Sequence, residues 1–286
     1  MKQTPKTVSN GHHGADRLSA LRPLRAFCGL VGEAAQTQFR KLFELAAVVA
    51  GVLTAAAQPG TWRPALRRSL ARQIISSGVE ASALIAFLAV AFGILLVAQY
   101  QLWLGGVVQS RWLGPVLNAV LVRELGPVLV NLILIARSGS TMASELALVH
   151  VSGEDRVAEG QGLDPVGYFV VPRVLALVIS AICLTTLLVA FSFLTVYIVG
   201  RWVSVNTGSF QEFAHLTLSA LTAADVVSLL LKTTIPPLLT GCICCLEGFG
   251  AEDTHAGVPR AARIAVQRSV VASFAVISGI SIWAYL

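Results

Sequence analysis

The chain has 286 residues, of which 55% are hydrophobic and 13% are charged, and its formal net charge is +6. Soluble proteins carry about 25% charged residues, so this composition excludes a soluble globular domain and indicates a polytopic membrane protein. The basic residues flank apolar runs and are not clustered with aromatic residues on one face, which argues against nucleic-acid binding.

Two parts precede the first apolar run. Residues 1–24 are polar and rich in basic residues, Gly and Ser, and we expect a disordered cytoplasmic head without a cleavable signal peptide. Residues 25–57 mix apolar and charged side chains as an amphipathic helix does, which predicts a helix lying in the membrane interface. Arginines follow it, so residues 25–73 are interpreted as an interfacial helix and a basic linker.

Residues 74–286 contain five segments that can each cross a membrane, which takes about 20 apolar residues. The predicted spans cover residues 74–97, 112–136, 174–200, 225–245 and 269–286. The pair Pro236-Pro237 predicts a kink in the fourth span. Arginines are concentrated in the segments that face the cytoplasm if the N-terminus is inside, and the positive-inside rule then puts the C-terminus in the periplasm. The expected fold is an all-α polytopic membrane protein with five transmembrane helices and an N-terminal amphipathic interfacial helix.

Three charged residues inside the predicted spans, Arg123, Glu124 and Lys232, form the first candidate site. Charges in a membrane helix are costly and often mark the path of a substrate or an ion, but they also pair with one another to escape hydrocarbon. Two interpretations stay open: an ion-pair network that locks the second helix to the fourth, and a polar cavity lining that meets a lipid head group or a partner helix.

The polar stretch at residues 138–165, between the second and third spans, is the second candidate site. Arg137 is expected to end the second span, and a short charged helix broken by glycine and proline should follow. The spacing of Glu159 and Gly162 ahead of an apolar run resembles the coupling motif of ABC importer permeases, in which a short helix docks into a groove of the ATPase. The candidate ATPase-coupling residues are Glu145, Glu154, Asp155, Arg156, Glu159 and Gly162.

Several motifs of catalysis and nucleotide binding do not occur in the sequence. It contains no G-x-x-x-x-G-K-[ST], H-E-x-x-H or G-x-S-x-G pattern. The cysteines are odd in number, and Cys242-x-x-Cys245 has neither a second pair nor a nearby His ligand, so packing in a helix is favoured over a metal or redox site. We therefore expect neither an ATPase site nor a metal site in this chain.

Five short motifs follow one another along the chain. They are Arg123-Glu-Leu-Gly-Pro127, Ala136-Arg-Ser-Gly139, Ala143-Ser-Glu-Leu146, Gly162-Leu-Asp-Pro165 and Val170-Val-Pro-Arg-Val-Leu175. In this order and spacing they resemble the MlaE-type permeases of MCE-associated ABC lipid transporters. The resemblance continues through residues 248–263 and covers nearly the whole chain after about residue 25.

The resemblance implies a homodimer of five-helix subunits in the bacterial inner membrane, with separate ABC ATPase subunits that bind ATP and Mg below it. It also implies a ring of MCE-domain protein in the periplasm and a lipid cavity enclosed by the two copies. Glu124 and Lys232 would lie near that cavity, and residues 145–162 would contact the ATPase. Because glycine costs about 1 kcal/mol in a helix, the glycines in residues 151–160 predict a short coupling helix.

The leading hypothesis is a permease subunit that moves phospholipid between the inner membrane and a periplasmic carrier, with no cofactor in this chain. The alternatives are a membrane scaffold that anchors an MCE complex without transporting, and a permease for sterols or other hydrophobic compounds. An intramembrane enzyme would need a reactive group, and its likeliest candidates are His150, His215 and the cysteines.

Overall fold

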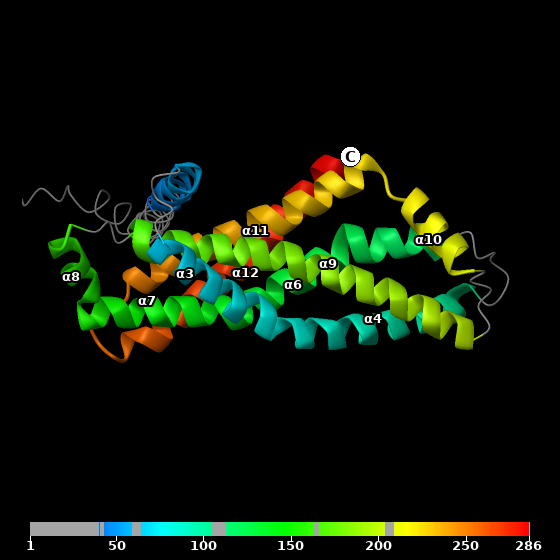
Figure 1. Ribbon diagram of the computed structural model, residues 1–286, viewed down its shortest axis with the longest axis horizontal. Helices are drawn as coiled ribbons and strands as arrows, with labels where there is room; N and C mark the ends of the chain where they lie inside the picture. The colour runs from blue at the N-terminus through cyan, green and yellow to red at the C-terminus, as the bar shows by residue number, and fades with distance from the viewer. Residues whose placement is uncertain are drawn as a thin grey trace, which may run out of the picture. The chain divides into compact units, whose positions relative to one another are not determined.

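The computed structural model describes residues 40, 43–58, 64–104, 113–162, 166–203 and 209–285. The predicted head at residues 1–24 lies outside this part of the chain. The chain divides into two compact units, Met1–Ala47 and Val48–Leu286, and all five long helices belong to the second unit (Figure 1). Every regular element in the described ranges is helical.

Five helical spans are long and apolar enough to cross a membrane among the described residues. They are Leu66–Leu102, Pro115–Ser152, Gly167–Trp202, Ala223–Phe249 and Gly257–Ala284. A shorter apolar helix, Phe43–Ala57, precedes them. The predicted fold class, an all-α membrane protein with five long helices and a shorter N-terminal helix, is confirmed.

Each span is built from one or more consecutive elements. The first contains α3 (Pro64–Ile74), η2 (Ile75–Val79) and α4 (Glu80–Leu104), where η marks a π-helical segment. The second contains α5 (Leu113–Leu117), η4 (Asn118–Leu125), α6 (Gly126–Leu134), η5 (Ile135–Gly139) and α7 (Ser140–Ser152), and α8 (Glu154–Gly160) follows it. The remaining elements are η6 (Val166–Val170), α9 (Val171–Trp202), α10 (Phe210–Ser219), α11 (Ala223–Phe249) and α12 (Gly257–Tyr285).

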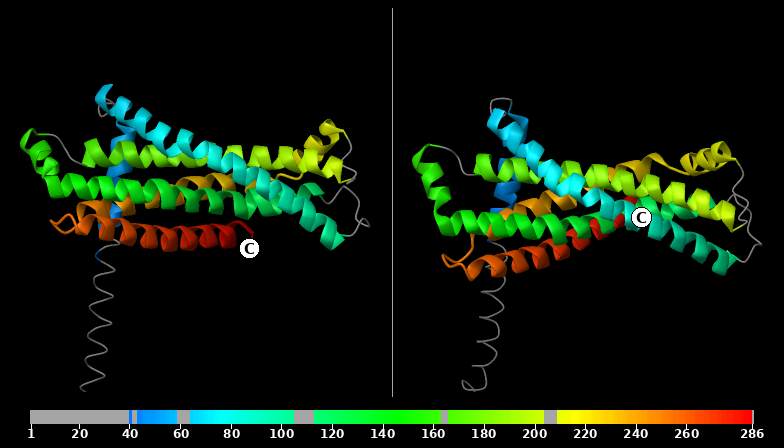
Figure 2. Two further views of the ribbon diagram at one scale, coloured as in Figure 1. Left: turned by 90° about the horizontal axis from the view of Figure 1, so that it is seen from below. Right: turned by 60° about the horizontal axis from the view of Figure 1, so that its bottom comes forward.

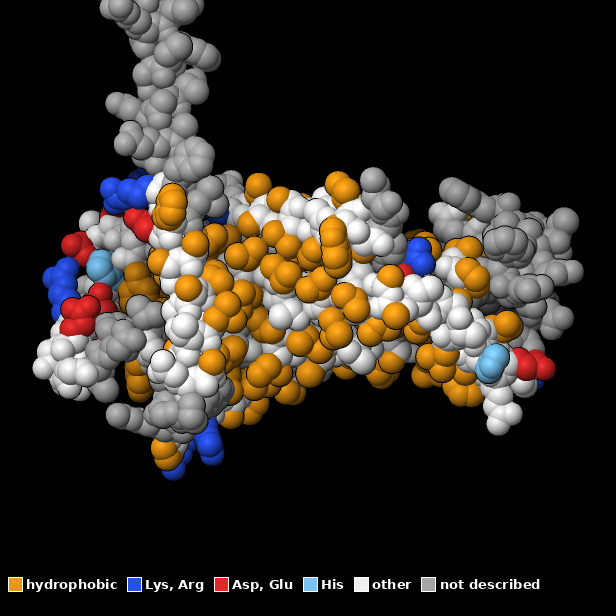
Figure 3. All heavy atoms as spheres, turned by 90° about the horizontal axis from the view of Figure 1, so that it is seen from above, with side chains coloured by type: hydrophobic (Ala, Val, Ile, Leu, Met, Phe, Trp, Pro, Cys, Tyr) orange, Lys and Arg blue, Asp and Glu red, His pale blue; other side chains and the backbone are white. Residues whose placement is uncertain are grey.

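The long helices of the second unit pack side by side. α11 packs against α12, α7 and α9, and α4 packs against α9 (Figures 1 and 2). Their shared core holds completely buried aliphatic side chains such as Ile85, Leu121 and Leu188. Hydrophobic side chains also cover the outer flank, while charged side chains gather mainly at the two ends (Figure 3). A bundle that is apolar both inside and on its flank is suited to hydrocarbon.

The two ends of the bundle carry different short elements. α8 and the connection between α11 and α12 lie at one end, which we call the α8 end, and α10 lies at the other (Figure 1). Ser209 caps α10 by accepting a hydrogen bond from the backbone N–H of Glu212, and the Glu212 carboxylate accepts one from the N–H of Ser209. This reciprocal capping explains why a helix forms in the segment between the third and fourth predicted spans.

The second helical span does not stop at Arg137, where the membrane span was expected to end, because the helix continues to Ser152. Hydroxyl groups in this stretch donate back to carbonyls one turn earlier, as Ser144 does to the Ser140 carbonyl at 2.6 Å. Met142 and Leu146 are buried in the bundle. Packing of this face therefore keeps a polar sequence helical.

Helices also extend beyond two other predicted limits. α3 begins at Pro64, before the first predicted span, and α12 begins at Gly257 although its predicted apolar run starts at residue 269. The flanking arginines are thus part of the helices and not of loops. α11 continues as one helix through Pro236-Pro237.

Glycine allows α7 and α11 to approach closely. A Cβ atom on Gly248 would lie 2.8 Å from the Leu146 Cβ atom and 3.0 Å from the Ala143 carbonyl oxygen. A side chain at this position would force the two helices apart, so Gly248 fixes their spacing at the α8 end.

Candidate functional site

Lys232 and Glu124 form an ion pair between α11 and η4. The Lys232 ammonium lies 2.9 Å from Glu124 Oε1 and donates a second hydrogen bond to the Arg123 carbonyl at 2.6 Å. The Lys232 side chain is 0% exposed, whereas that of Glu124 is 47% exposed. Ser281, on α12, donates to Glu124 Oε1 at 2.9 Å. The cluster therefore ties three helices together and leaves one carboxylate facing outwards.

Asn131 holds the same region from α6. Its side-chain amide donates to the Lys232 carbonyl at 3.1 Å. This bond satisfies a polar group of a proline-containing helix, since the prolines at 236 and 237 have no N–H to donate to the carbonyls one turn earlier. The position of Lys232 is thus determined both at its backbone and at its ammonium.

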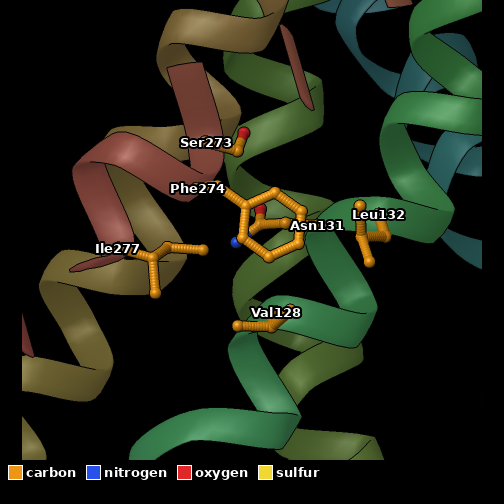
Figure 4. Close-up of a pocket in the computed structure, with 6 residues that line it drawn as sticks. All are labelled: Val128, Asn131, Leu132, Ser273, Phe274 and Ile277. Carbon is orange, nitrogen blue, oxygen red and sulfur yellow. The ribbon is translucent and has the colours of Figure 1, made fainter. Parts of the chain in front are cut away.

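A small notch lies beside Asn131 between α6 and α12. Figure 4 shows its lining, with the Phe274 ring beside Asn131. Its empty space of about 160 Å³ includes open solvent, and the notch encloses no cavity of the kind that usually holds a ligand. This notch alone is too small for a phospholipid.

Arg123 pairs with a residue that the sequence analysis did not select. Arg123 Nε lies 2.7 Å from Oδ1 of Asp225, whose side chain is 0% exposed. Asp225 Oδ2 also accepts hydrogen bonds from the backbone N–H and the hydroxyl of Thr222, which caps α11. The spacing Thr222-x-x-Asp225 is a capping box, and it could have been found in the sequence as the start of a helix.

The polar stretch at residues 138–165 contains two helices joined at a glycine. α7 ends at Gly153, whose φ angle is +74°, and α8 then runs for seven residues to Gly160. Gly162 also has a φ of +74°, and its N–H donates to the Glu159 carbonyl at 2.9 Å. Glycine adopts such angles without strain. The predicted short helix is therefore present and is bounded by glycines.

A polar cluster at the α8 end is centred on His150. Its Nδ1 atom lies 2.6 Å from Asp155 Oδ2, and its Nε2 atom lies 3.5 Å from Oδ1 of Asp253. Partial burial raises the pKa of Asp155. Hydrogen bonds from His150 and from the Arg156 backbone N–H, together with the positive charges of the His150 and Arg156 side chains, lower this pKa by more than burial raises it. The net effect puts this pKa below its ordinary value of 3.8.

The other predicted coupling residues occupy different positions. Glu145 is on α7, and its carboxylate accepts a hydrogen bond from Arg173 of α9 at 3.3 Å. Glu154 and Glu159 are exposed on α8. The structure thus brings Asp155 and Arg156 together with His150 and Asp253. Glu145 is not part of this cluster and pairs with Arg173.

The two candidate sites are far from one another. Glu124 and His150 lie on the same helical span, separated by about 39 Å along the axis at 1.5 Å per residue. His215, on α10, is at the opposite end from His150. No group of three or more His, Cys, Asp or Glu residues that could hold a metal occurs in the searched, described part of the chain. Cys242, Cys244 and Cys245 are free thiols buried in α11.

Comparison with known families decides the class of the protein. Residues 70–283 match the family described as Permease MlaE. The chain belongs to the MlaE permease family.

Named relatives of this MlaE permease agree with that assignment. A probable ABC transporter permease protein of Rickettsia typhi is 30% identical over 73% of this chain and 80% of its own length. The intermembrane phospholipid transport system permease protein MlaE of Haemophilus influenzae is 27% identical over 73% of this chain and 81% of its own length. The chloroplastic protein trigalactosyldiacylglycerol 1 of Arabidopsis thaliana is 29% identical over 58% of this chain and 47% of its own length.

Membership of the family has two direct consequences. The MlaE permease is a multi-pass membrane protein, and an ABC permease works with an ATPase partner. Permeases of ABC transporters typically lack ATPase activity themselves.

Proposed function

We propose that this chain is the transmembrane permease subunit of an ATP-driven, MCE-type lipid transporter that moves phospholipid between the inner membrane and a periplasmic carrier. The observation that carries the proposal is the pairing of the fully buried Lys232 with the half-exposed Glu124. An intramembrane charge pair that presents one group to its surroundings is typical of a substrate path. The phospholipid named for the Haemophilus influenzae relative supports the substrate class.

The proposed assembly contains two copies of this chain, because a lipid needs a larger chamber than the notch between α6 and α12. Residues 74–286 would form the permease domain, with residues 138–165 as its coupling region. Separate ABC ATPase subunits, which bind ATP and Mg, would contact α8 through Glu154, Asp155, Arg156, Glu159 and Gly162. A periplasmic MCE-domain protein would receive or deliver the lipid at the α10 end.

This arrangement fixes the proposed orientation in the inner membrane. The α8 end would face the cytoplasm, as would the N-terminus, and the C-terminus would face the periplasm. Exposed arginines on α3, among them Arg67, Arg68 and Arg72, agree with a cytoplasmic position for that helix end.

Arg123 has a different proposed role from Glu124 and Lys232. Its side chain is 34% exposed while its partner Asp225 is buried, so its guanidinium can keep the ion pair and still meet a phosphate. Guanidinium groups bind phosphate with paired hydrogen bonds. Lys232, which is fully buried, would act by holding Glu124 in place.

The experiment is reconstitution of the chain with its ATPase in vesicles that contain a fluorescent phospholipid, with an acceptor carrier protein outside. ATP-dependent transfer of the phospholipid is expected. A scaffold would assemble the same complex without ATP-dependent transfer. A permease for another hydrophobic compound would transfer a fluorescent sterol in preference to the phospholipid.

A further inference from the structure

The imidazole of His150 lies between two carboxylates from different segments of the chain. Asp155 belongs to α8, at 2.6 Å, and Asp253 belongs to the connection between α11 and α12, at 3.5 Å. Arg156, next to Asp155, adds a longer contact of 3.9 Å to Asp253. The side chains of His150 and Asp155 are only 23% and 13% exposed. Their interaction is therefore screened by water and salt less than a surface pair would be.

α8 is a short helix between two glycines. Gly153 before it and Gly162 after it both have a φ of +74°, and Ala158 is its buried residue. Residues at the ends of an element commonly absorb the backbone changes of a hinge. The contacts of His150 with Asp155 and Asp253 therefore join this short helix to the α11–α12 connection.

The α11–α12 connection leads directly to the charged site of the membrane region. α12 begins at Gly257, soon after Asp253, and carries Ser281 near its other end. Ser281 donates to the Glu124 carboxylate at 2.9 Å. A helix of 29 residues, about 44 Å long, thus links the two. Movement of the connection would shift α12 against Glu124.

We propose that His150 is a positioning residue that makes α8 and the α11–α12 connection move as one unit. An ATPase bound at α8 then acts on α12 as well as on α7. This inference rests on the proposed ATP-driven transport. A histidine that only stabilised the fold would affect the amount of active protein and not the lipid moved for each ATP.

The first test measures lipid moved per ATP hydrolysed by the complete complex in vesicles. His150→Ala is expected to lower this ratio at least about fivefold, the lower range of allosteric coupling, while ATP hydrolysis continues. His150→Gln keeps a donor and an acceptor and should restore part of the ratio. Asp253→Asn should lower the ratio too, and combining it with His150→Ala should add nothing.

A matched control is an ion pair between the first turn of α12 and the same connection. Arg260 pairs with Glu252 at 3.0 Å, and neither carboxylate bound to His150 is involved. Arg260→Ala should therefore keep the ratio of the wild type. A parallel fall of ATP hydrolysis and lipid movement in His150→Ala, or additive effects of the His150 and Asp253 variants, would overturn the inference.

A second measurement does not depend on lipid transport. Spin labels at Val157 on α8 and at Glu252 in the connection report the distance between them, and both positions are more than half exposed. In the complex with its ATPase, the mean distance between the labels should be the same with and without a non-hydrolysable ATP analogue. In His150→Ala the distribution of distances should become broader. A wild-type distance that changes with nucleotide overturns the inference. A complex that moves no lipid contradicts only the proposed function.

Discussion

Lys232 is completely enclosed by the protein, whereas Glu124, whose carboxylate lies 2.9 Å from the Lys232 ammonium, keeps almost half of its side chain exposed. The two partners therefore differ in what each can contact when the other is removed. Loss of Glu124 leaves a buried ammonium with the Arg123 carbonyl as a neutral acceptor. Loss of Lys232 leaves a carboxylate that still accepts from Ser281 and reaches the surroundings.

This asymmetry predicts unequal effects of two substitutions. Glu124→Ala, which removes the carboxylate without supplying another acceptor, should destabilise the protein by about 3–5 kcal/mol, as expected when a buried charge loses its partner. Lys232→Met, which fills the same space, should cost only about 1–3 kcal/mol. The unfolding midpoints of the purified variants compare the two. If both substitutions lower the stability by the same large amount, Glu124 faces hydrocarbon or a second copy of the chain. That result would favour an ion pair that locks the helices over a polar cavity lining.

Close packing of α7 and α11 predicts that Gly248 tolerates no side chain. In Gly248→Ala the new Cβ atom would meet the Leu146 side chain and the Ala143 backbone, so overpacking should cost about 1–3 kcal/mol. Gly51, in the N-terminal helix, has no such neighbour within 4 Å. Gly51→Ala is therefore the control and should leave the thermal midpoint unchanged or slightly raised. A Gly248→Ala protein as stable as the wild type would refute the packing argument.

The lowered pKa of Asp155 predicts an acid limit for the attachment of α8. Because this pKa lies below 3.8 in the folded protein, the carboxylate stabilises the cluster fully above its ordinary pKa. That contribution is lost as pH falls through the folded-state pKa. Hydrogen exchange of the α8 amides, corrected for intrinsic rates, should accelerate below about pH 4. Asp155→Asn should exchange faster at neutral pH already, and an unchanged profile in this variant would contradict the prediction.

Charge reversal on α8 should uncouple the transporter. Glu154 and Glu159 are exposed, so Glu154→Lys or Glu159→Lys should leave the fold intact while changing the contact with the ATPase. Lipid moved per ATP hydrolysed is expected to fall at least about fivefold. Gln211→Lys, which adds a positive charge on α10 at the other end, should have no effect. If neither α8 variant changes ATPase stimulation or lipid movement, α8 is not the coupling element.

Uninterrupted apolar sequence made the long helices predictable. The third span was expected at residues 174–200, and α9 covers Val171–Trp202, because its central residues carry no charge. The continuation of the second helix as α7 was not predicted, because Ser and Thr are common in loops. Here their hydroxyls bond to the preceding turn, and Glu145 is paired with Arg173. Local sequence does not reveal such distant partners.

The charged site was predicted only in part for the same reason. Arg123, Glu124 and Lys232 were recognisable as charges inside apolar helices. Asp225 and Ser281 become partners only when the fold brings segments about 100 or more residues apart together. Ser281 has no sequence signal at all, since a serine in an apolar helix normally bonds to its own backbone.

The length of the second helical span has one more consequence. Its 38 residues extend over about 57 Å, whereas the hydrocarbon of a bilayer is about 30 Å thick. In the proposed orientation, α7 would therefore extend beyond the hydrocarbon on the cytoplasmic side, together with the adjoining ends of α11 and α12. An ATPase bound at α8 would then be separated from the lipid head groups. The lipid composition of the nearby leaflet should therefore not change the affinity of the ATPase for α8.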